Sequence, residues 1–277
     1  MVNQLTATDI ERMSYTDFIA LLKETNRCPG GKKTIRRIRE LIHIDEKTKI
    51  LDVGSNTGFT SLEFARITPA HICGIDISEP CVAEARKLLL EDVENVRSRI
   101  TFQVASAYEI PFPSDSFDLV MVGGATSFMD NKEKAITEYL RVLKPWGFLV
   151  LSPLTYHTNP PQSLIDNVGN IIKVQIKPMT SKDWISVVSE AAEDFELYFQ
   201  EHHTLLPRTN RELKEYADYF IEKDHIKVLS EDVRETIGTK WLNILKCFNE
   251  NHKYLGYDLL IFRKRLIFEE SELFTSI

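Results

Sequence analysis

Hydrophobic and polar positions follow two different patterns along the chain. Between Lys49 and Ser152, short apolar runs alternate with segments of helical periodicity. Such alternation is typical of strand, helix, strand units around a parallel sheet whose strands are buried on both faces. The runs that we predict as strands are KILDVG, HICGID, RITFQV, FDLVMV and GFLVLS, followed later by FELYFQ and LGYDLLIFRKR. Because parallel strands need crossover connections, we expect an α/β fold with a doubly wound, seven-stranded, mostly parallel sheet.

Helical periodicity dominates the segments outside this alternation. One helix is expected over 8–24 and a second, rich in basic residues, over 32–42. Two more, near 210–222 and 231–249, lie between the last two predicted strands and form an insertion. The patterns divide the chain into an N-terminal helical part (1–45), an α/β core (46–200, completed by 254–268) and a helical insertion (201–253).

The composition is that of an ordinary globular protein with an acidic balance. The chain has 277 residues, with 34 Lys and Arg against 41 Asp and Glu, and a formal net charge of −7. This charge argues against stable nucleic-acid binding, because that affinity comes largely from basic side chains that neutralise phosphates. The 4 cysteines form no C-x-x-C pair, so a reducing compartment fits best. With no signal peptide and no apolar run of membrane-spanning length in view, we interpret the chain as cytoplasmic, without a membrane partner.

One loop carries the clearest candidate chemistry. The segment ILDVGSNTGFTSLEFAR predicts a strand, a turn over Gly54–Gly58 and a helix that begins near Phe59. In an open α/β sheet, ligands bind at this place, outside the carboxyl end of a strand and facing helix N–H groups. The spacing does not match the G-x-G-x-x-G of dinucleotide binding, and no G-K-S/T follows as in a phosphate-binding loop. The pattern that remains is D-x-G-x-N-x-G.

A second marker is the acidic end of the next predicted strand. The sequence GIDIS places Asp76 at a position 24 residues after Asp52. A carboxylate there can accept hydrogen bonds from both hydroxyl groups of a ribose. The competing interpretation is a helix cap for the segment that starts at Ser78. Because Asp76 follows the glycine loop, ribose binding is the preferred interpretation.

These motifs resemble those of class I S-adenosylmethionine-dependent methyltransferases, whose glycine loop usually reads D/E-x-G-x-G-x-G. The stretches ASAYEIPFPSDSFDLVMV and EYLRVLKPWGFLVLS are similar to two further motifs of the methyltransferase type 11 group, and ETNRCPGGKKT is similar to a Pro-Gly-Gly entrance in some small-molecule members. The resemblance covers roughly residues 26–152. Three positions depart from it: Asn56 replaces the middle glycine, Ser106 replaces an aspartate that contacts adenine, and Trp146 replaces the first glycine of a later Pro-Gly-Gly. Since Asn tolerates positive φ, we expect the loop to keep its shape.

The resemblance implies an enzyme with a Rossmann-like methyltransferase fold that binds S-adenosylmethionine and releases S-adenosylhomocysteine. It also implies that the N-terminal helices form a lid and that the insertion covers the substrate site. The cofactor-binding residues that it implies are Asp52, Gly54, Ser55, Asn56, Gly58, Asp76, Ile77, Ser106, Ala107 and Gly123. Tyr108 is an alternative to Ile77 for the contact with adenine.

Methyl transfer from this cofactor is an in-line displacement, which needs a nucleophile held about 3 Å from the methyl carbon. Positioning can suffice, but a hydroxyl or protonated amine also needs a base. No metal is expected, because the chain has no H-E-x-x-H or clustered His and Cys spacing. The first candidate base is His157, after the fifth strand, although a single loop histidine is also typical of an exposed polar residue. Tyr15 is a candidate to cover the cofactor, with a place in an apolar helix stripe as its alternative. The other loop candidates are Gly123, Gly124, Ser127, Phe128, Met129 and Tyr156.

The residues and the resemblance together predict a methyltransferase that acts on N or O, less readily C, of a small-molecule acceptor. A protein or RNA acceptor is the alternative within the same chemistry. RNA is disfavoured by the net charge and by the loop GGATSF, which lacks an N-P-P-Y or D-P-P-Y tetrapeptide. A non-catalytic module that binds S-adenosylmethionine is the alternative of another class, favoured by Asn56 and Ser106.

Overall fold

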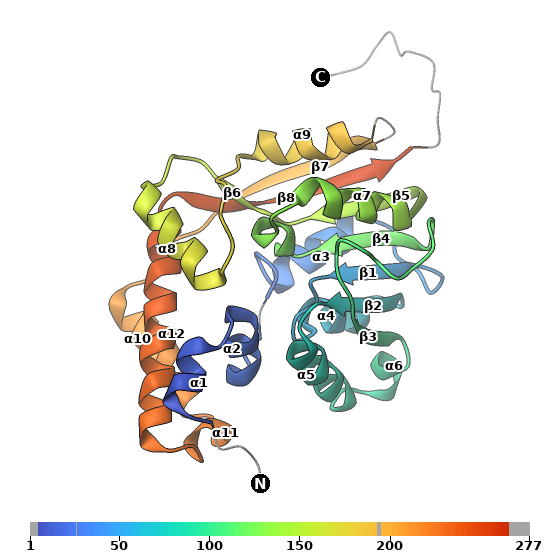
Figure 1. The fold of residues 1–277 in the computed structure, drawn as a ribbon. Helices are drawn as coiled ribbons and strands as arrows, with labels where there is room; N and C mark the ends of the chain where they lie inside the picture. Colours follow the sequence, from blue (N-terminus) through green and yellow to red (C-terminus); the bar gives the residue numbers. More distant parts are fainter. Residues whose placement is uncertain (1–4, 26, 193–194, 266–277) are drawn as a thin grey trace.

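A mixed sheet lies at the centre of the structure. The computed structural model describes residues 5–25, 27–192 and 195–265, and Figure 1 shows the sheet with helices around it. The strand order begins β3-β2-β1-β4-β5, with neighbours parallel, and β8 runs antiparallel to β5. The strands are β1 (Lys49–Val53), β2 (His71–Asp76), β3 (Ile100–Val104), β4 (Phe117–Val122), β5 (Leu143–Leu151), β6 (Leu154–Tyr156), β7 (Phe195–Thr204) and β8 (Leu255–Lys264).

The short strand β6 is the one that the hydrophobic pattern does not indicate, since its three residues are too few to show a period. It pairs with β8 beside the end of β5, and β7 pairs along the other edge of β8. The sheet therefore has eight strands instead of seven. The predicted fold class, a doubly wound and mostly parallel α/β sheet, is confirmed.

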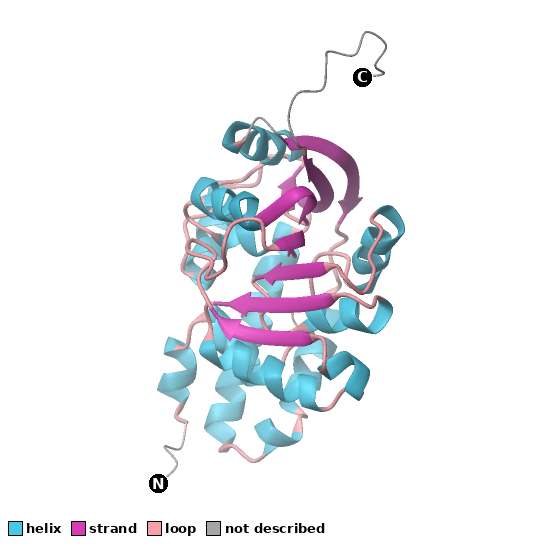
Figure 2. Cartoon of the chain, turned by 90° about the vertical axis from the view of Figure 1, so that its right-hand side faces the viewer, coloured by secondary structure: helices cyan, strands magenta, loops and turns pink. Residues whose placement is uncertain are grey.

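Helices cover both faces of the sheet, as the continuous apolar runs predict. Neighbouring strand residues point to opposite faces, so that Ile50 packs with one helix layer and Leu51 with the other. Both side chains are fully buried, and Figure 2 shows helices on either side of the strands. The first layer contains α3 (Lys32–Leu41), α4 (Phe59–Ile67), α5 (Glu79–Leu90) and α6 (Glu94–Arg97). The second contains α7 (Lys132–Val142) and α9 (Ser181–Ala191).

The remaining helices form a helical cap, which we define as α1 (Ala7–Arg12), α2 (Tyr15–Leu22), α8 (Gln162–Ile172), α10 (Asn210–Ile221), α11 (Asp224–Lys227) and α12 (Glu231–Asn251). The cap has its own apolar core, in which Phe18 of α2 meets Trp241 of α12 with ring centroids 6.2 Å apart. Helices α1 and α2 of the predicted N-terminal part therefore pack on the helices of the predicted insertion, beside the sheet (Figure 1), whereas α3 of that part packs on the sheet itself. Among the described residues, no helix combines the length and the apolar character needed to cross a membrane.

The single helix expected over 8–24 is wrong, because the structure divides it into α1 and α2. Ser14 between them has extended backbone angles, φ −60° and ψ 159°, and its hydroxyl accepts the N–H of Asp17 at 3.2 Å. A side chain that caps a helix also interrupts the helix before it. The Ser14 and Asp17 pair is visible in the sequence and marks this break.

Candidate active site

The glycine loop, Gly54–Gly58, turns sharply between β1 and α4. Gly54, Asn56 and Gly58 all have positive φ, at 72°, 46° and 88°. Asn56 thus adopts the conformation expected of it, and its side-chain oxygen accepts the N–H of Thr57 at 2.8 Å. The N–H groups of Gly54 and Ser55 both donate to the carbonyl of Ile75 at 2.9 Å, which ties the loop to the neighbouring strand. A Cβ on Gly54 would lie 2.3 Å from Cβ of Ala125, so only glycine fits there.

Asp76 joins the glycine loop to the start of α5. Its carboxylate accepts the N–H of Asn56 at 2.8 Å on one oxygen and the N–H of Ser78 at 2.9 Å on the other. Asp76 is only 8% exposed, and this burial raises the pKa of its carboxyl group. The cap of α5 is Ser78, whose hydroxyl accepts the N–H of Cys81 at 3.4 Å. Each oxygen of Asp76 therefore keeps a lone pair for a ligand hydroxyl.

Asp52 lies beneath the loop and not at its mouth. Its carboxylate accepts a hydrogen bond from the hydroxyl of Ser61 in α4 at 2.6 Å. Burial raises the pKa of Asp52 to about 7, and the charge of Asp76 adds to the rise. Two carboxylates that repel each other in a buried site favour a positively charged ligand between or beside them.

The residues expected near adenine include one with an unusual exposure. Ile77 follows the buried Asp76 and is 73% exposed, which leaves an apolar surface beside the ribose-binding candidate. Ser106 and Ala107 are half-buried, and the hydroxyl of Ser106 accepts the N–H of Tyr108 at 3.1 Å. The Tyr108 hydroxyl accepts the N–H of Asn131 at 3.3 Å, so this ring leans toward α7. Of the two alternatives for an adenine contact, Ile77 is exposed beside Asp76, whereas Tyr108 is hydrogen-bonded to Asn131.

The N-terminal segment crosses these loops. Asp17 of α2 accepts a hydrogen bond from the Ser78 hydroxyl at 3.1 Å, and the Thr57 hydroxyl donates to the carbonyl of Glu24 at 3.1 Å. A Cβ on Gly123 would lie 2.6 Å from Cβ of Cys28, which places the Pro-Gly-Gly segment against the loop after β4. The N-terminal segment therefore packs against the glycine loop, the start of α5 and the loop after β4.

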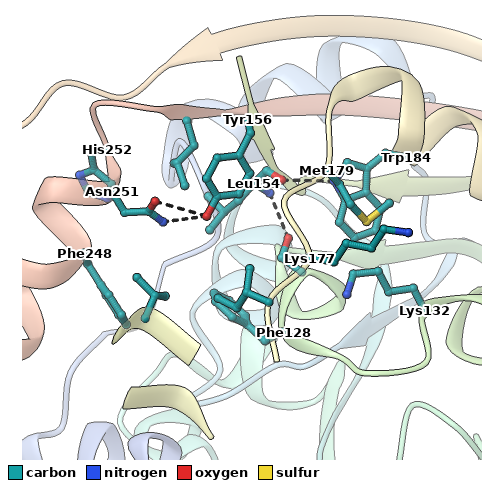
Figure 3. A pocket seen from close by; sticks show the side chains of 14 residues that line it. Phe128, Lys132, Leu154, Tyr156, Lys177, Met179, Trp184, Phe248, Asn251 and His252 are labelled. Carbon is teal, nitrogen blue, oxygen red and sulfur yellow. Dashed lines mark hydrogen bonds between the residues drawn. The ribbon is translucent and has the colours of Figure 1, made fainter. Parts of the chain in front are cut away.

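A pocket of about 570 Å³, including its open mouth, lies beyond the carboxyl ends of β4 and β5. We call it the acceptor pocket, and Figure 3 shows the side chains that face it. It is lined by Ser127, Phe128, Lys132, Leu154, Tyr156, Val168, Ile176, Lys177, Met179, Trp184, Phe248, Asn251, His252 and Leu255. The short helix η1 (Ala125–Phe128) separates it from the glycine loop. Ala125 touches Gly54, whereas Ser127 and Phe128 face the pocket, so η1 is a wall shared by the two sites.

One polar pair lies inside this pocket. Tyr156 is mostly buried, and its hydroxyl accepts a hydrogen bond from the side-chain amide of Asn251 at 2.9 Å (Figure 3). The neighbouring His252 also lines the pocket. Burial lowers the pKa of His252, and the charge of Arg208 adds to this effect, so the imidazole is neutral at pH 7.

The two residues predicted for catalysis lie outside the pocket lining. His157 is exposed, whereas the preceding Tyr156 points inward, because successive residues in extended backbone face opposite ways. Tyr15 packs on Phe248 of the pocket wall with ring centroids 5.6 Å apart, and burial raises the pKa of its phenol. The candidates Ser127, Phe128 and Tyr156 do reach the pocket.

The pocket residues that sequence reasoning missed come from the far parts of the chain. Asn251 and His252 stand where α12 ends and β8 is about to begin, and Lys177 lies in the connection before α9. Trp184 is buried, and its indole N–H donates to the carbonyl of Leu154 at 3.2 Å. For Tyr156 there is a local signal, because successive residues in extended backbone alternate and Tyr156 faces the side opposite to His157. The sequence around the other pocket residues gives no such signal, because only packing between distant segments brings them together.

Comparison with known proteins points to a common family. Residues 51–151 match the family described as "Methyltransferase domain". The chain is 31% identical over 177 residues to an uncharacterized protein of Haemophilus influenzae, which covers 63% of this chain and 70% of that protein. It is 36% identical over 146 residues to the ubiquinone/menaquinone biosynthesis C-methyltransferase UbiE of Geobacter sulfurreducens, which covers 52% of this chain and 55% of the relative.

Two similarities extend over nearly whole chains. The 27-O-demethylrifamycin SV methyltransferase of Amycolatopsis mediterranei is 25% identical over 272 residues, 95% of this chain and 93% of the relative. The crystal structure of MccD protein superposes with a TM-score of 0.72 and 28% identity, over 87% of this chain and 100% of that chain. The similarity to these two proteins therefore includes the helical cap.

Proposed function

Because the chain belongs to the class I S-adenosylmethionine-dependent methyltransferases of the type 11 group, we propose that it methylates a small molecule bound in the acceptor pocket. The observation that carries the proposal is the shared wall η1, with Gly54 on one side and the pocket on the other. A cofactor on the glycine loop and an acceptor in the pocket would meet at this wall.

The residues around the glycine loop fit S-adenosylmethionine. Asp76 keeps a lone pair on each oxygen for the ribose hydroxyls, and Ile77 offers an exposed apolar surface to adenine. The positive φ of Gly54 and the close approach of Ala125 to it fix the shape of the loop. The buried carboxylates of Asp52 and Asp76 suit a cation. When bound, the cofactor supplies a methyl group activated by a positively charged sulfur.

The acceptor atom that we propose is N or O. Either atom can need a base, and His252 is a neutral imidazole in the pocket wall that can accept a proton. Tyr156 and Asn251 add a donor and an acceptor beside it. We therefore assign the base to His252 instead of His157. The rest of the pocket is mostly apolar, so the chain's own contribution is to orient the acceptor and exclude water.

Titration calorimetry with S-adenosylmethionine and S-adenosylhomocysteine tests the cofactor site. Asp76→Ala should weaken the binding of both by about 1.5–3 kcal/mol, the size of a hydrogen bond to a charged group. Glu79→Ala, which removes an exposed carboxylate from the same region, should leave the affinity unchanged. Full affinity in Asp76→Ala would show that the ribose assignment is wrong.

A second measurement separates an enzyme from a module that only binds the cofactor. The protein is incubated with labelled S-adenosylmethionine and a pool of small metabolites, and S-adenosylhomocysteine is measured over time. We expect its formation to depend on the pool. Tight cofactor binding without any turnover above background would favour the non-catalytic alternative.

A further inference from the structure

The acceptor pocket contains two lysines and no acidic side chain. Lys132 and Lys177 both line it, whereas none of its lining residues is Asp or Glu. Figure 3 shows both lysines on the side of the pocket opposite Asn251 and His252. The chain as a whole has a net charge of −7, so this local positive charge does not reflect the general composition.

Lys132 is held in a position that is costly for a cation. The residue is only 8% exposed, and it stands at the first position of α7, where the positive end of the helix dipole disfavours a further positive charge. Burial lowers the pKa of Lys132; the charges of Glu133 and Asp130 oppose this effect, and the charge of Lys177 adds to it. Its ammonium donates to the carbonyl of Met129 at 2.6 Å and lies 6.0 Å from the centroid of the Trp184 ring. Two of its three N–H donors are left for another partner.

The surrounding carboxylates act on the two lysines only from a distance. Within the described part of the chain, neither Lys132 nor Lys177 forms an ion pair. The nearby Asp130 and Glu133 are exposed to solvent. Asp183 is also exposed, and its carboxylate accepts the N–H of Thr180 at 2.7 Å and the Thr180 hydroxyl at 2.8 Å. A buried cation without a paired carboxylate fits a site that an anion completes.

We infer that the acceptor carries a terminal anionic oxygen group, which Lys132 binds inside the pocket and Lys177 attracts at its mouth. The inference rests on the proposed function, since it names the class of substrate for the same pocket. Leu154, Val168 and Ile176 line the pocket together with these groups, so the acceptor also has an apolar body. The substrate class is an amphipathic acid, with the methylated N or O reached from the side of Asn251 and His252. Carboxylates and phosphate monoesters share the required chemistry.

The test uses the full chain saturated with S-adenosylhomocysteine. A panel of arylalkyl and medium-chain carboxylic acids is titrated by calorimetry, each beside the alcohol and the phosphate monoester of the same skeleton. In the best-binding series, we expect the anions to bind about tenfold to about a hundredfold more tightly than the alcohol, as for a hydrogen bond to a charged group. The carboxylate and phosphate arms identify which anion is preferred, and a preference for either supports the inference.

Three variants locate the effect. Lys132→Met should abolish the preference for the anion while leaving the affinities for the alcohol and for S-adenosylhomocysteine unchanged, and Lys177→Met should reduce it. Lys182→Met removes a lysine of α9 that, like Lys177, is exposed but does not line the pocket, and it should leave all of these affinities unchanged. The ligand-free stability of Lys132→Met should be equal to or above that of the parent chain, because a buried charge is removed. A purely structural lysine would instead lower it.

The outcomes distinguish this inference from the proposed function. Loss of S-adenosylhomocysteine binding in the parent chain overturns the proposed function itself. Normal binding of that product, with no series in which an anion is preferred in a Lys132-dependent way, overturns the inference alone.

Discussion

The glycine loop and the acceptor pocket are built in opposite ways. The glycine loop takes five consecutive residues, Gly54–Gly58, and its shape comes from positive φ angles and from N–H groups that bond the next strand. The acceptor pocket takes side chains from Ser127 to Leu255, supplied by η1, α7, β6, α8, α9, α12, β8 and the connections between them. Backbone geometry fixes the first and tertiary packing fixes the second. Cofactor affinity and acceptor choice should therefore change independently, except at η1.

The largest effect should fall on the pocket alone. His252→Gln removes the proposed base, and loss of general base catalysis costs about 100-fold or more in rate. We expect kcat to fall to that extent with the acceptor found in the metabolite pool, while the affinity for S-adenosylhomocysteine stays the same. The matched variant His157→Gln changes an exposed histidine and should keep full activity. If the two variants behave in the reverse way, the sequence-based choice of His157 was right.

The shared wall gives the next effect. Gly54→Ala places a Cβ 2.3 Å from Cβ of Ala125 at a residue with φ of 72°. The backbone strain alone costs about 1–3 kcal/mol in the free energy of unfolding. A loop that relaxes away from this shape should also bind the cofactor more weakly in calorimetry. Adding Ala125→Gly should recover the part due to the contact. Gly238→Ala in α12 is the control, since its Cβ would meet Ile221 at an ordinary 3.6 Å. Failure of the second substitution to recover any affinity would argue against η1 as a shared wall.

Tyr156→Phe should have a smaller effect, and this effect should fall on the acceptor pocket and not on the glycine loop. It leaves the buried amide of Asn251 without its partner, which costs about 1–3 kcal/mol in the free energy of unfolding. We expect a higher KM for the acceptor and an unchanged affinity for the cofactor, with stability followed by chemical denaturation. Tyr198→Phe removes the hydroxyl of an exposed tyrosine on β7. It should change neither the KM for the acceptor nor the free energy of unfolding. A cofactor affinity that fell together with the acceptor affinity would show that the sites are not independent.

The smallest effect concerns pH and belongs to the glycine loop. The pKa of Asp52 is raised to about 7 in the folded chain, so its carboxylate becomes charged as the pH rises from 6 to 8. A charged Asp52 attracts the sulfonium of S-adenosylmethionine. The affinity for S-adenosylmethionine should therefore rise over this pH range relative to the affinity for S-adenosylhomocysteine, whose sulfur is uncharged. In the ligand-free chain, the free energy of unfolding changes in the opposite direction and falls as the pH rises. A carboxyl with a raised pKa favours folding at low pH, and that contribution is lost as the pH rises through about 7.

Asp52→Asn provides the control for both measurements. It should flatten the pH dependence of the affinity ratio and remove this part of the pH dependence of thermal stability. A ratio that follows the same curve in Asp52→Asn would assign the titration to another group, such as Asp76.

Sequence patterns predicted most of the sheet and the ligand-facing loop. Seven of the eight strands follow from apolar runs, because strands buried on both faces read as continuous hydrophobic segments. The positive φ of Asn56 also follows from the residue type. The capping pattern of Ser14 and Asp17 is local and can be read, but the helical periodicity around it favours a single helix. Strand β6 could not be predicted, since its pairing with β8 connects residues about a hundred positions apart.

Whether a property can be read from the sequence depends on the range of the forces that produce it. The chain by itself determined the α/β fold, the glycine loop and the place of Asp76, because these depend on residues that are close in sequence and on the directions of strands. Only the tertiary structure decided that Tyr156 and not His157 faces the pocket, and that the end of α12 supplies His252 and Asn251. It alone buried Lys132 beside Trp184. Burial and side-chain direction come from packing between distant segments, and they carry the chemistry of the acceptor pocket.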